Sequence, residues 1–221
     1  MNIKYFSGVV PKDDRIRADM EADPRFGFLL TPNMHNRPPA GAWGADTGCF
    51  TAAGGDNFCP EKYLAWLKSR PVSSCLFATA PDVLADPVTT IARSLPVLPA
   101  IRAAGFRAAL VAQDGLEKLE VPWSQFDCLF LGGRPMDDPA DEWKLSLAAA
   151  ELVHEAKARG LWVHMGRVNS YRRLKYAAAI GCDSADGTFL KFAPRENYGR
   201  MLEWFRKLGV PGPELEERAA A

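Results

Sequence analysis

The stretch "LWVHMGRVNSYRRLKYAAAIGCDSADG" (161–187) decides the fold class. It opens with a short apolar run containing valine and tryptophan, which is typical of a buried strand. A helical segment follows at 169–181, with Asn169 or Ser170 as its N-cap. A second apolar run, "AAIGC" (178–182), then leads to two aspartates. A strand, a helix and a further strand joined by short connections predict a parallel sheet.

The same alternation extends over most of the chain. The runs expected to be strands are "FGFLL" (26–30), "AWGA" (42–45), "SCLFATA" (74–80), "RAALVA" (107–112), "FDCLFL" (126–131), "LWVHM" (161–165) and "AAIGC" (178–182), with weaker candidates at "KYFSGVV" (4–10) and "TFLKF" (188–192). Helices are expected at 60–70 and 138–160. Seven to nine short strands favour a closed (β/α)8 barrel of the TIM type over an open doubly wound sheet, and a total of eight requires one of the weaker candidates.

Length and composition agree with one barrel. The chain has 221 residues, of which 48% are apolar, which is enough for one sizeable core and close to the lower limit for this fold. No repeat or long linker divides it, so residues 1–221 are expected to form a single compact domain. The formal net charge is zero, so no global basic field indicates a nucleic-acid partner. With no apolar run long enough to cross a bilayer and no secretory signal, we expect a cytoplasmic protein without a membrane partner.

Cysteine usage argues against disulfides and zinc. The chain has five cysteines, an odd number, with no C-x-x-C spacing: Cys49, Cys59, Cys75, Cys128 and Cys182. A disulfide framework needs pairs, and a structural zinc site needs closely spaced ligands. We therefore expect reduced thiols, no bound metal and no cofactor.

Polar residues or glycines follow six successive apolar runs, at the point where each run ends. They are Asp46, Asp82, Gln113, Gly132, Gly133, Gly166, Asp183 and Asp186. At any single position a turn or a helix cap is the commoner explanation. In a parallel barrel, however, all carboxyl ends of the strands open onto one face, where these groups would line one pocket. The set suits a planar heterocycle that donates and accepts hydrogen bonds, with Phe50 and Met165 expected to cover its two faces.

Five short motifs resemble, in order, those of the tRNA-guanine transglycosylase superfamily. They are "DTGCF" (46–50) for D-S-G-G-F, "VAQDG" (111–115) for V-Q-G-G, "LGG" (131–133), "HMG" (164–166) for L-M-G, and "GCDSAD" (181–186) for G-I-D-x-F-D. The resemblance spans about residues 26–190. Members are (β/α)8 barrels that exchange guanine in a polynucleotide for a 7-deazaguanine base. The resemblance therefore implies a pentosyltransferase.

The resemblance also implies a role for each matching residue. Asp186 falls on the nucleophile, which attacks the anomeric carbon and forms a covalent glycosyl-enzyme. Asp46 falls on the second carboxylate, which recognises the base and moves its proton. Asp82 matches the aspartate that binds the guanine edge. Gln113 and the N–H of Gly133 would hold the carbonyl oxygen of the base.

Departures from the family pattern bear on the substrate. Members that act on tRNA carry a C-x-C-x-x-C…H zinc cluster after the nucleophile, whereas here no cysteine follows Cys182 and the chain ends about 35 residues beyond Asp186. This resembles the compact, zinc-less DNA-guanine transglycosylases that install preQ0-type 7-deazaguanines in phage and bacterial DNA. We therefore rank DNA ahead of tRNA as the partner, with a free 7-deazaguanine base as second substrate, and a viral origin would fit.

Local charge is consistent with a polynucleotide. Between residues 166 and 207 there are nine lysines or arginines and four acidic residues. Such residues contact phosphates, although an ordinary solvated helix face explains the charge equally well. The expected nucleic-acid contacts are Arg167, Arg172, Arg173, Lys175, Lys191 and Arg195.

Several alternatives stay open at this point. The chain could act on tRNA with a partner subunit, or be a non-catalytic nucleic-acid-binding accessory subunit. It could also be an unrelated small-molecule glycosidase or lyase, and a homo-oligomer is a further option. His164 and Met165 point to opposite sides of one strand, and with Met165 facing the pocket we expect His164 to face the helices as a structural residue. Asp183, three residues before Asp186, is expected to be a packing, capping or supporting group.

Overall fold

The computed structural model describes residues 2–8, 13–33, 40–49, 58–136 and 142–213. Within them, eight parallel strands pair in sequence order and close into a barrel, with β8 hydrogen-bonded to β1. The strands are β1 (Lys4–Ser7), β2 (Phe26–Leu30), β3 (Trp43–Ala45), β4 (Cys75–Thr79), β5 (Ala108–Ala112), β6 (Cys128–Leu131), β7 (Trp162–Met165) and β8 (Ser184–Gly187). The expected (β/α)8 barrel is confirmed.

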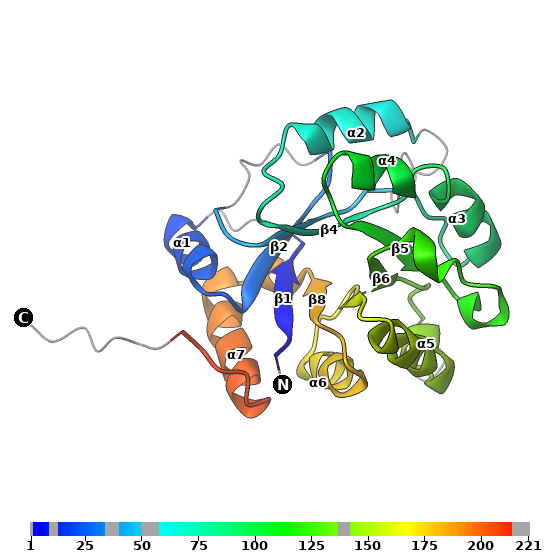
Figure 1. Cartoon of the computed structure of the whole chain (residues 1–221). Helices are drawn as coiled ribbons and strands as arrows, with labels where there is room; N and C mark the ends of the chain where they lie inside the picture. Colours follow the sequence, from blue (N-terminus) through cyan, green and yellow to red (C-terminus); the bar gives the residue numbers. More distant parts are fainter. Residues whose placement is uncertain (1, 9–12, 34–39, 50–57, 137–141, 214–221) are drawn as a thin grey trace, which may run out of the picture.

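The helices lie around the outside of the barrel, as Figure 1 shows. They are α1 (Asp14–Ala22), α2 (Pro60–Lys68), α3 (Pro87–Ser94), α4 (Leu98–Ala103), α5 (Leu147–Ala158), α6 (Tyr171–Ile180) and α7 (Pro194–Lys207). Local sequence sets several of their ends. The Ser170 side chain accepts a hydrogen bond from the Arg173 amide at the start of α6, and Gly181 ends this helix with a φ of 101°.

Two layers of apolar side chains make up the core. The outer layer lies between the strands and the helices, and the inner layer fills the barrel. The inner layer is rich in phenylalanine, and the Phe6 and Phe77 rings lie 6.0 Å apart. Glycines make room for these rings, because a Cβ at Gly27 would lie 2.5 Å from the Phe6 ring and one at Gly44 would lie 2.7 Å from the Phe77 ring. The interior is therefore a packed core with the site above it.

The last strand differs from its prediction. Residues 178–182, expected as a strand, are the end of α6 and the turn after it, and β8 is the four-residue segment Ser184–Gly187. Alanines extend a helix well, and Gly181 supplies the left-handed residue that ends it. Of the two weaker strand candidates, 4–10 contains β1, whereas 188–192 contains a short 3-10 helix, Phe189–Lys191.

The predicted helix at 138–160 begins later than expected. A 3-10 turn, Trp143–Leu145, comes first, and α5 begins at Leu147 because the Ser146 side chain caps it through the Ala149 amide. Helical spacing would place Leu147 on one apolar stripe with Trp143 and Val153, but Leu147 is the first residue of α5 and is 84% exposed. The structure does not describe residues 137–141.

Candidate active site

A pocket of about 180 Å³ opens at the carboxyl ends of the strands. Its walls are formed by Leu29, Asp46, Asp82, Leu84, Val111, Gln113, Phe130, Gly132, Gly133, Gly166, Arg167 and Asp186. Seven of these residues are among those that the sequence predicted for the pocket, and Arg167 was predicted as a nucleic-acid contact. Enzymes with this fold have their active sites at this end of the barrel. The pocket is smaller than the roughly 300–1,000 Å³ of sites for drug-sized ligands, so it suits a single small ring system.

Asp186 enters the pocket from β8 and is 8% exposed. Its Oδ1 lies 3.0 Å from Nε2 of His164 on the neighbouring strand β7. His164 is fully buried inside the barrel, where its ring contacts those of Phe6, Phe77 and Phe130. The prediction that His164 faces the helices is therefore wrong.

Met165 has the opposite orientation. It is fully buried in the outer layer of the core, between the barrel and the helices, and it does not line the pocket. The expectation that Met165 covers one face of a bound ring is wrong, because successive side chains of a strand point to opposite faces and His164 takes the inward one. Phe50, expected on the other face, lies outside the described residues.

Asp46 follows β3 directly and forms part of the pocket wall. Its Oδ1 accepts a hydrogen bond from the Gly48 amide at 2.9 Å and a longer one from the Thr47 hydroxyl at 3.5 Å. Burial raises the pKa of Asp46, and the nearby charge of Asp186 acts in the same direction. A raised pKa makes this carboxyl better suited than an ordinary aspartate to hold and donate a proton.

Asp82 is held by Gln113, a nearly fully buried residue that follows β5. Gln113 Nε2 donates to Asp82 Oδ2 at 2.6 Å, and its Oε1 accepts from the amide of Ala85 at 3.0 Å. Both ends of the Gln113 amide are thus engaged by the loop after β4. Burial raises the pKa of Asp82 to about 7, with the charge of Asp46 as the next cause.

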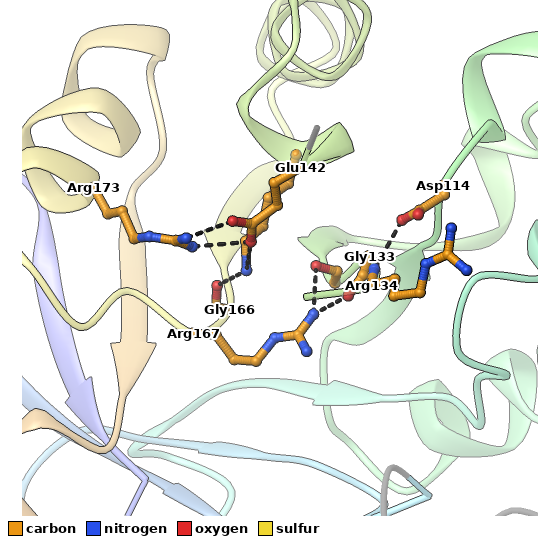
Figure 2. A network of polar contacts seen from close by, with 9 residues as sticks. Asp114, Gly133, Arg134, Glu142, Gly166, Arg167 and Arg173 are labelled. Atoms are coloured by element: carbon orange, nitrogen blue, oxygen red, sulfur yellow. Dashed lines mark hydrogen bonds and ion pairs between the residues drawn. The ribbon is translucent and has the colours of Figure 1, made fainter. Parts of the chain in front are cut away.

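Arg167 also lines the pocket, and Figure 2 shows its polar contacts. Arg167 follows β7 with a left-handed backbone, φ 58°, and its Nη2 donates to the carbonyl oxygens of Gly132 and Gly133. The Asp114 carboxylate accepts from the Arg134 amide at 2.9 Å, on the far side of the same turn. The glycine turn after β6 is therefore held from both neighbouring loops.

A buried network of charged residues contacts the pocket wall at Gly166. Lys144, 1% exposed, donates to the Gly166 carbonyl oxygen at 2.7 Å and lies 3.1 Å from Oε1 of Glu142. Arg173 of α6 binds both oxygens of Glu142, as Figure 2 shows. Burial lowers the pKa of Lys144 to about 8, with the positive charge of Arg167 as the next cause. Glu142 and Lys144 were not predicted from the sequence, because nothing in "DEWK" (141–144) distinguishes them from a solvated helix start.

The remaining predicted nucleic-acid contacts are dispersed. Arg172, Lys175 and Lys191 are exposed. Arg195 is also exposed and forms an ion pair with Asp13 at 2.7 Å. Arg173, by contrast, is taken up by Glu142.

All five cysteines are free. Within the described ranges, no group of three or more histidine, cysteine or acidic side chains is placed to hold a metal ion. In the same part of the chain, no helix is long and apolar enough to span a membrane.

Fold and site together define a (β/α)8 barrel protein with an acidic pocket at the carboxyl ends of its strands. No family model and no curated protein matches the sequence. Among solved structures, phosphoribosyl anthranilate isomerase from Thermus thermophilus is similar at 16% identity and a TM-score of 0.52, over 94% of this chain and 100% of that chain.

Two further structures are similar. One is the 4-hydroxy-2-oxoglutarate aldolase/2-deydro-3-deoxyphosphogluconate aldolase from TTHB1, at 12% identity and a TM-score of 0.53, over 93% of this chain and 92% of that chain. The other is the native KDPGal structure, at 13% identity and a TM-score of 0.50, over 93% and 94%. The isomerase and the aldolase are enzymes by name, but at these identities the likeness establishes the fold alone and assigns no family.

Proposed function

We propose that this protein is a base-exchange glycosyltransferase that replaces guanine in DNA with a 7-deazaguanine base. The observation that carries the proposal is the gathering of Asp46, Asp82 and Asp186 around one pocket of the size of a single ring system. Two carboxyl groups at one glycosidic bond are the requirement for a double displacement through a covalent intermediate. The order of the five motifs that resemble the transglycosylases supports the same chemistry.

The first half-reaction forms the glycosyl-enzyme. A carboxylate oxygen of Asp186 attacks C1′ of the target nucleotide, a C1′–O bond forms and the C1′–N9 bond breaks. The electron pair of the broken bond passes to guanine. Asp46, whose pKa is raised by burial, donates its proton to the leaving base.

The second half-reaction reverses these steps with the new base. The carboxylate of Asp46 takes the N9 proton of the incoming 7-deazaguanine. The N9 electron pair attacks C1′, the bond from C1′ to the Asp186 oxygen breaks, and the carboxylate is regenerated. Atoms and electrons balance without a cofactor.

The pocket walls suit a purine-like ring. Leu29, Val111 and Phe130 supply apolar surface. Asp82, when ionised, accepts hydrogen bonds from the N–H groups on the guanine edge, and Gln113 positions it for this role. In the glycine turn after β6, the N–H of Gly132 donates to the Ala112 carbonyl oxygen, and the N–H of Gly133 is the group proposed to bind the carbonyl oxygen of the base.

The similarity to an aldolase structure does not extend to Schiff-base chemistry at this pocket. An aldolase of the Schiff-base type needs a lysine amine that reaches the substrate. Among the described residues, no lysine lines the pocket, and Lys144, which lies nearby, is bound to Gly166 and Glu142.

The experiment is base exchange with radiolabelled guanine, offered with duplex DNA and with tRNA in separate reactions. Asp186→Asn and Asp46→Asn are the test variants, and Asp183→Asn, just before the strand that carries Asp186, is the matched control. Label that enters DNA with the wild type and the control, but not with the test variants, supports the proposal. Label that enters only tRNA overturns the choice of substrate. Absence of label in both, with no covalent protein–nucleic acid adduct on a denaturing gel, overturns the chemistry and favours an accessory role.

A further inference from the structure

A line of hydrogen bonds runs through the barrel interior and ends on Asp186. Trp162 Nε1 donates to Ser184 Oγ at 2.9 Å. Ser184 Oγ lies 2.7 Å from His164 Nδ1, and His164 Nε2 lies 3.0 Å from Asp186 Oδ1. Trp162 and His164 belong to β7 and the other two to β8, with His164 and Ser184 directly opposite each other in the strand register.

Donor and acceptor chemistry gives this line a direction. The indole N–H of Trp162 can only donate, so Ser184 Oγ accepts from it. The Asp186 carboxylate can only accept, so the proton in its bond to His164 lies on Nε2, and the Ser184 hydroxyl can donate its own proton to Nδ1. An imidazole that accepts at Nδ1 carries its proton at Nε2, where it donates to the Asp186 carboxylate. Each member thus fixes the orientation of the next, and the last bond reaches Oδ1 of Asp186.

The three polar side chains resemble a Ser–His–Asp triad, but access excludes serine as the nucleophile. Ser184 and His164 are both fully buried, and neither lines the pocket. Of the four hydrogen-bonded residues, only Asp186 lines the pocket. The line therefore serves the carboxylate and not the hydroxyl.

The surroundings of His164 hold its ring in place. The rings of Phe130, Phe77 and Phe6, from three other strands, lie 4.5, 4.8 and 5.6 Å from it. Burying an imidazole among aromatic rings costs free energy unless its nitrogens are hydrogen-bonded. Both nitrogens of His164 have partners, so the ring is fixed by packing and by polar contacts together.

We propose that His164, oriented by Ser184 and Trp162, is a positioning residue for Asp186: it holds Oδ1 and turns Oδ2 toward the pocket as the attacking oxygen. The nucleophile role in this statement rests on the proposed function. The family motif that "HMG" resembles has leucine at the position of His164, so the resemblance does not supply this role.

The test compares His164→Phe, which fills the space without a hydrogen bond, with His164→Gln, whose amide can donate to Asp186. His154→Phe, at an exposed position on α5, is the matched control. Because a small displacement of a reacting group costs on the order of 10²-fold in rate, we expect His164→Phe to lower kcat for exchange by about that factor. KM should stay within a few-fold, His164→Gln should recover part of the loss, and the control should match wild type. Wild-type kcat in His164→Phe, or equal losses in the Phe and Gln variants, would overturn the positioning role.

A second measurement separates this inference from the proposed function. Nitrogen-15 NMR of the histidine side chains reads the tautomer of His164 without any substrate. We expect a proton at Nε2, and a shift of that resonance in Asp186→Asn but not in Asp183→Asn. A proton at Nδ1 alone would disprove the line of hydrogen bonds. If instead the NMR result is as expected and the wild type exchanges no base, the proposed function fails, and the nucleophile role fails with it.

Discussion

Two aspartates three residues apart, one just before β8 and one within it, have opposite surroundings. Asp183, at the base of the barrel, accepts hydrogen bonds from Lys157 Nζ at 2.8 and 2.7 Å and from the Val163 amide at 2.8 Å. Asp186, about 10 Å further along the strand, is hydrogen-bonded to His164 and faces the pocket that also contains Asp46 and Asp82. One aspartate is therefore bound into the fold at the base of the barrel, whereas the other lines the pocket.

Other aspartates at the two ends of the barrel differ in the same way. At the base, Asp127 binds Arg102 through both oxygens, at 3.0 and 2.8 Å, and also accepts from the Ala108 amide. At the pocket, burial raises the pKa of both Asp46 and Asp82, so ionising these carboxyl groups is unfavourable in the folded state. Active sites often retain such unfavourable charge, and the rest of the fold compensates for it.

The largest effect is expected at Asp186. Asp186→Asn removes the nucleophile with little change in shape, so we expect base exchange to fall by about 10³-fold or more. The apparent midpoint of thermal unfolding should stay close to that of wild type, because the amide can still accept from His164. Exchange rates and unfolding curves measured on the same preparations check both parts. An active Asp186→Asn protein would remove the distinction between the two ends.

The second largest effect is expected at Lys144, a buried charge at the pocket end of the barrel that is bound to Glu142 and Gly166. Lys144→Met removes its bonds to Glu142 and Gly166, and breaking a buried ion pair costs about 3 kcal/mol. We expect a loss of that order in the free energy of unfolding by urea, whereas the exposed Lys118→Met should match wild type. An unchanged unfolding midpoint would show that the ion pair with Arg173 alone compensates for the buried charge of Glu142.

The third prediction concerns pH and Asp82. Its pKa of about 7 in the folded protein exceeds the ordinary aspartate value of about 3.9. Between these two pH values the folded state therefore binds a proton that the unfolded state has released. Stability attributable to Asp82 is therefore present at low pH and lost as pH rises toward 7 and above, on the order of 2 kcal/mol after allowance for partial exposure.

Comparison of wild type with Asp82→Asn isolates this group from the others that titrate. The difference in unfolding free energy should grow between pH 5 and pH 8 in favour of the variant. Binding of free guanine should show the opposite trend, tightening in wild type as Asp82 ionises and losing this dependence in the variant. Parallel pH profiles for the two proteins would contradict the assignment.

The smallest effect is expected at the base. Asp183→Asn weakens a partly exposed ion pair and keeps an acceptor for the Val163 amide, so a loss of about 1 kcal/mol in unfolding free energy is expected. Exchange activity should remain within a few-fold of wild type. A loss of activity as large as that of Asp186→Asn, with the fold intact, would show that the base of the strand also takes part in the chemistry.

Local sequence predicted the last strand poorly. "SADG" has no apolar periodicity, and β8 exists because its backbone pairs with β1 and β7. "AAIGC" has the composition of a short buried strand and yet ends α6. Pairing between segments distant in the chain overrides local preference in sheets, which explains both errors.

The sequence by itself determined the barrel and most of the pocket wall. Apolar runs alternating with helices specify a parallel sheet, and in a closed parallel barrel every carboxyl end opens onto the same face. That topology brought Asp46, Asp82 and Gln113 together, as expected from their places at the ends of the runs, and Asp186 joins them from within β8. No knowledge of side-chain contacts was needed for this.

Only the tertiary structure decided which side chains support the carboxylates. Alternation along β7 requires His164 and Met165 to face opposite ways, but only the pairing of His164 with Phe130 and Ser184 shows that His164 is the inward one. The partners of Asp186 and of Lys144 likewise come from other elements. Their contacts depend on strand register and loop packing, which are long-range properties that no local pattern in the sequence encodes.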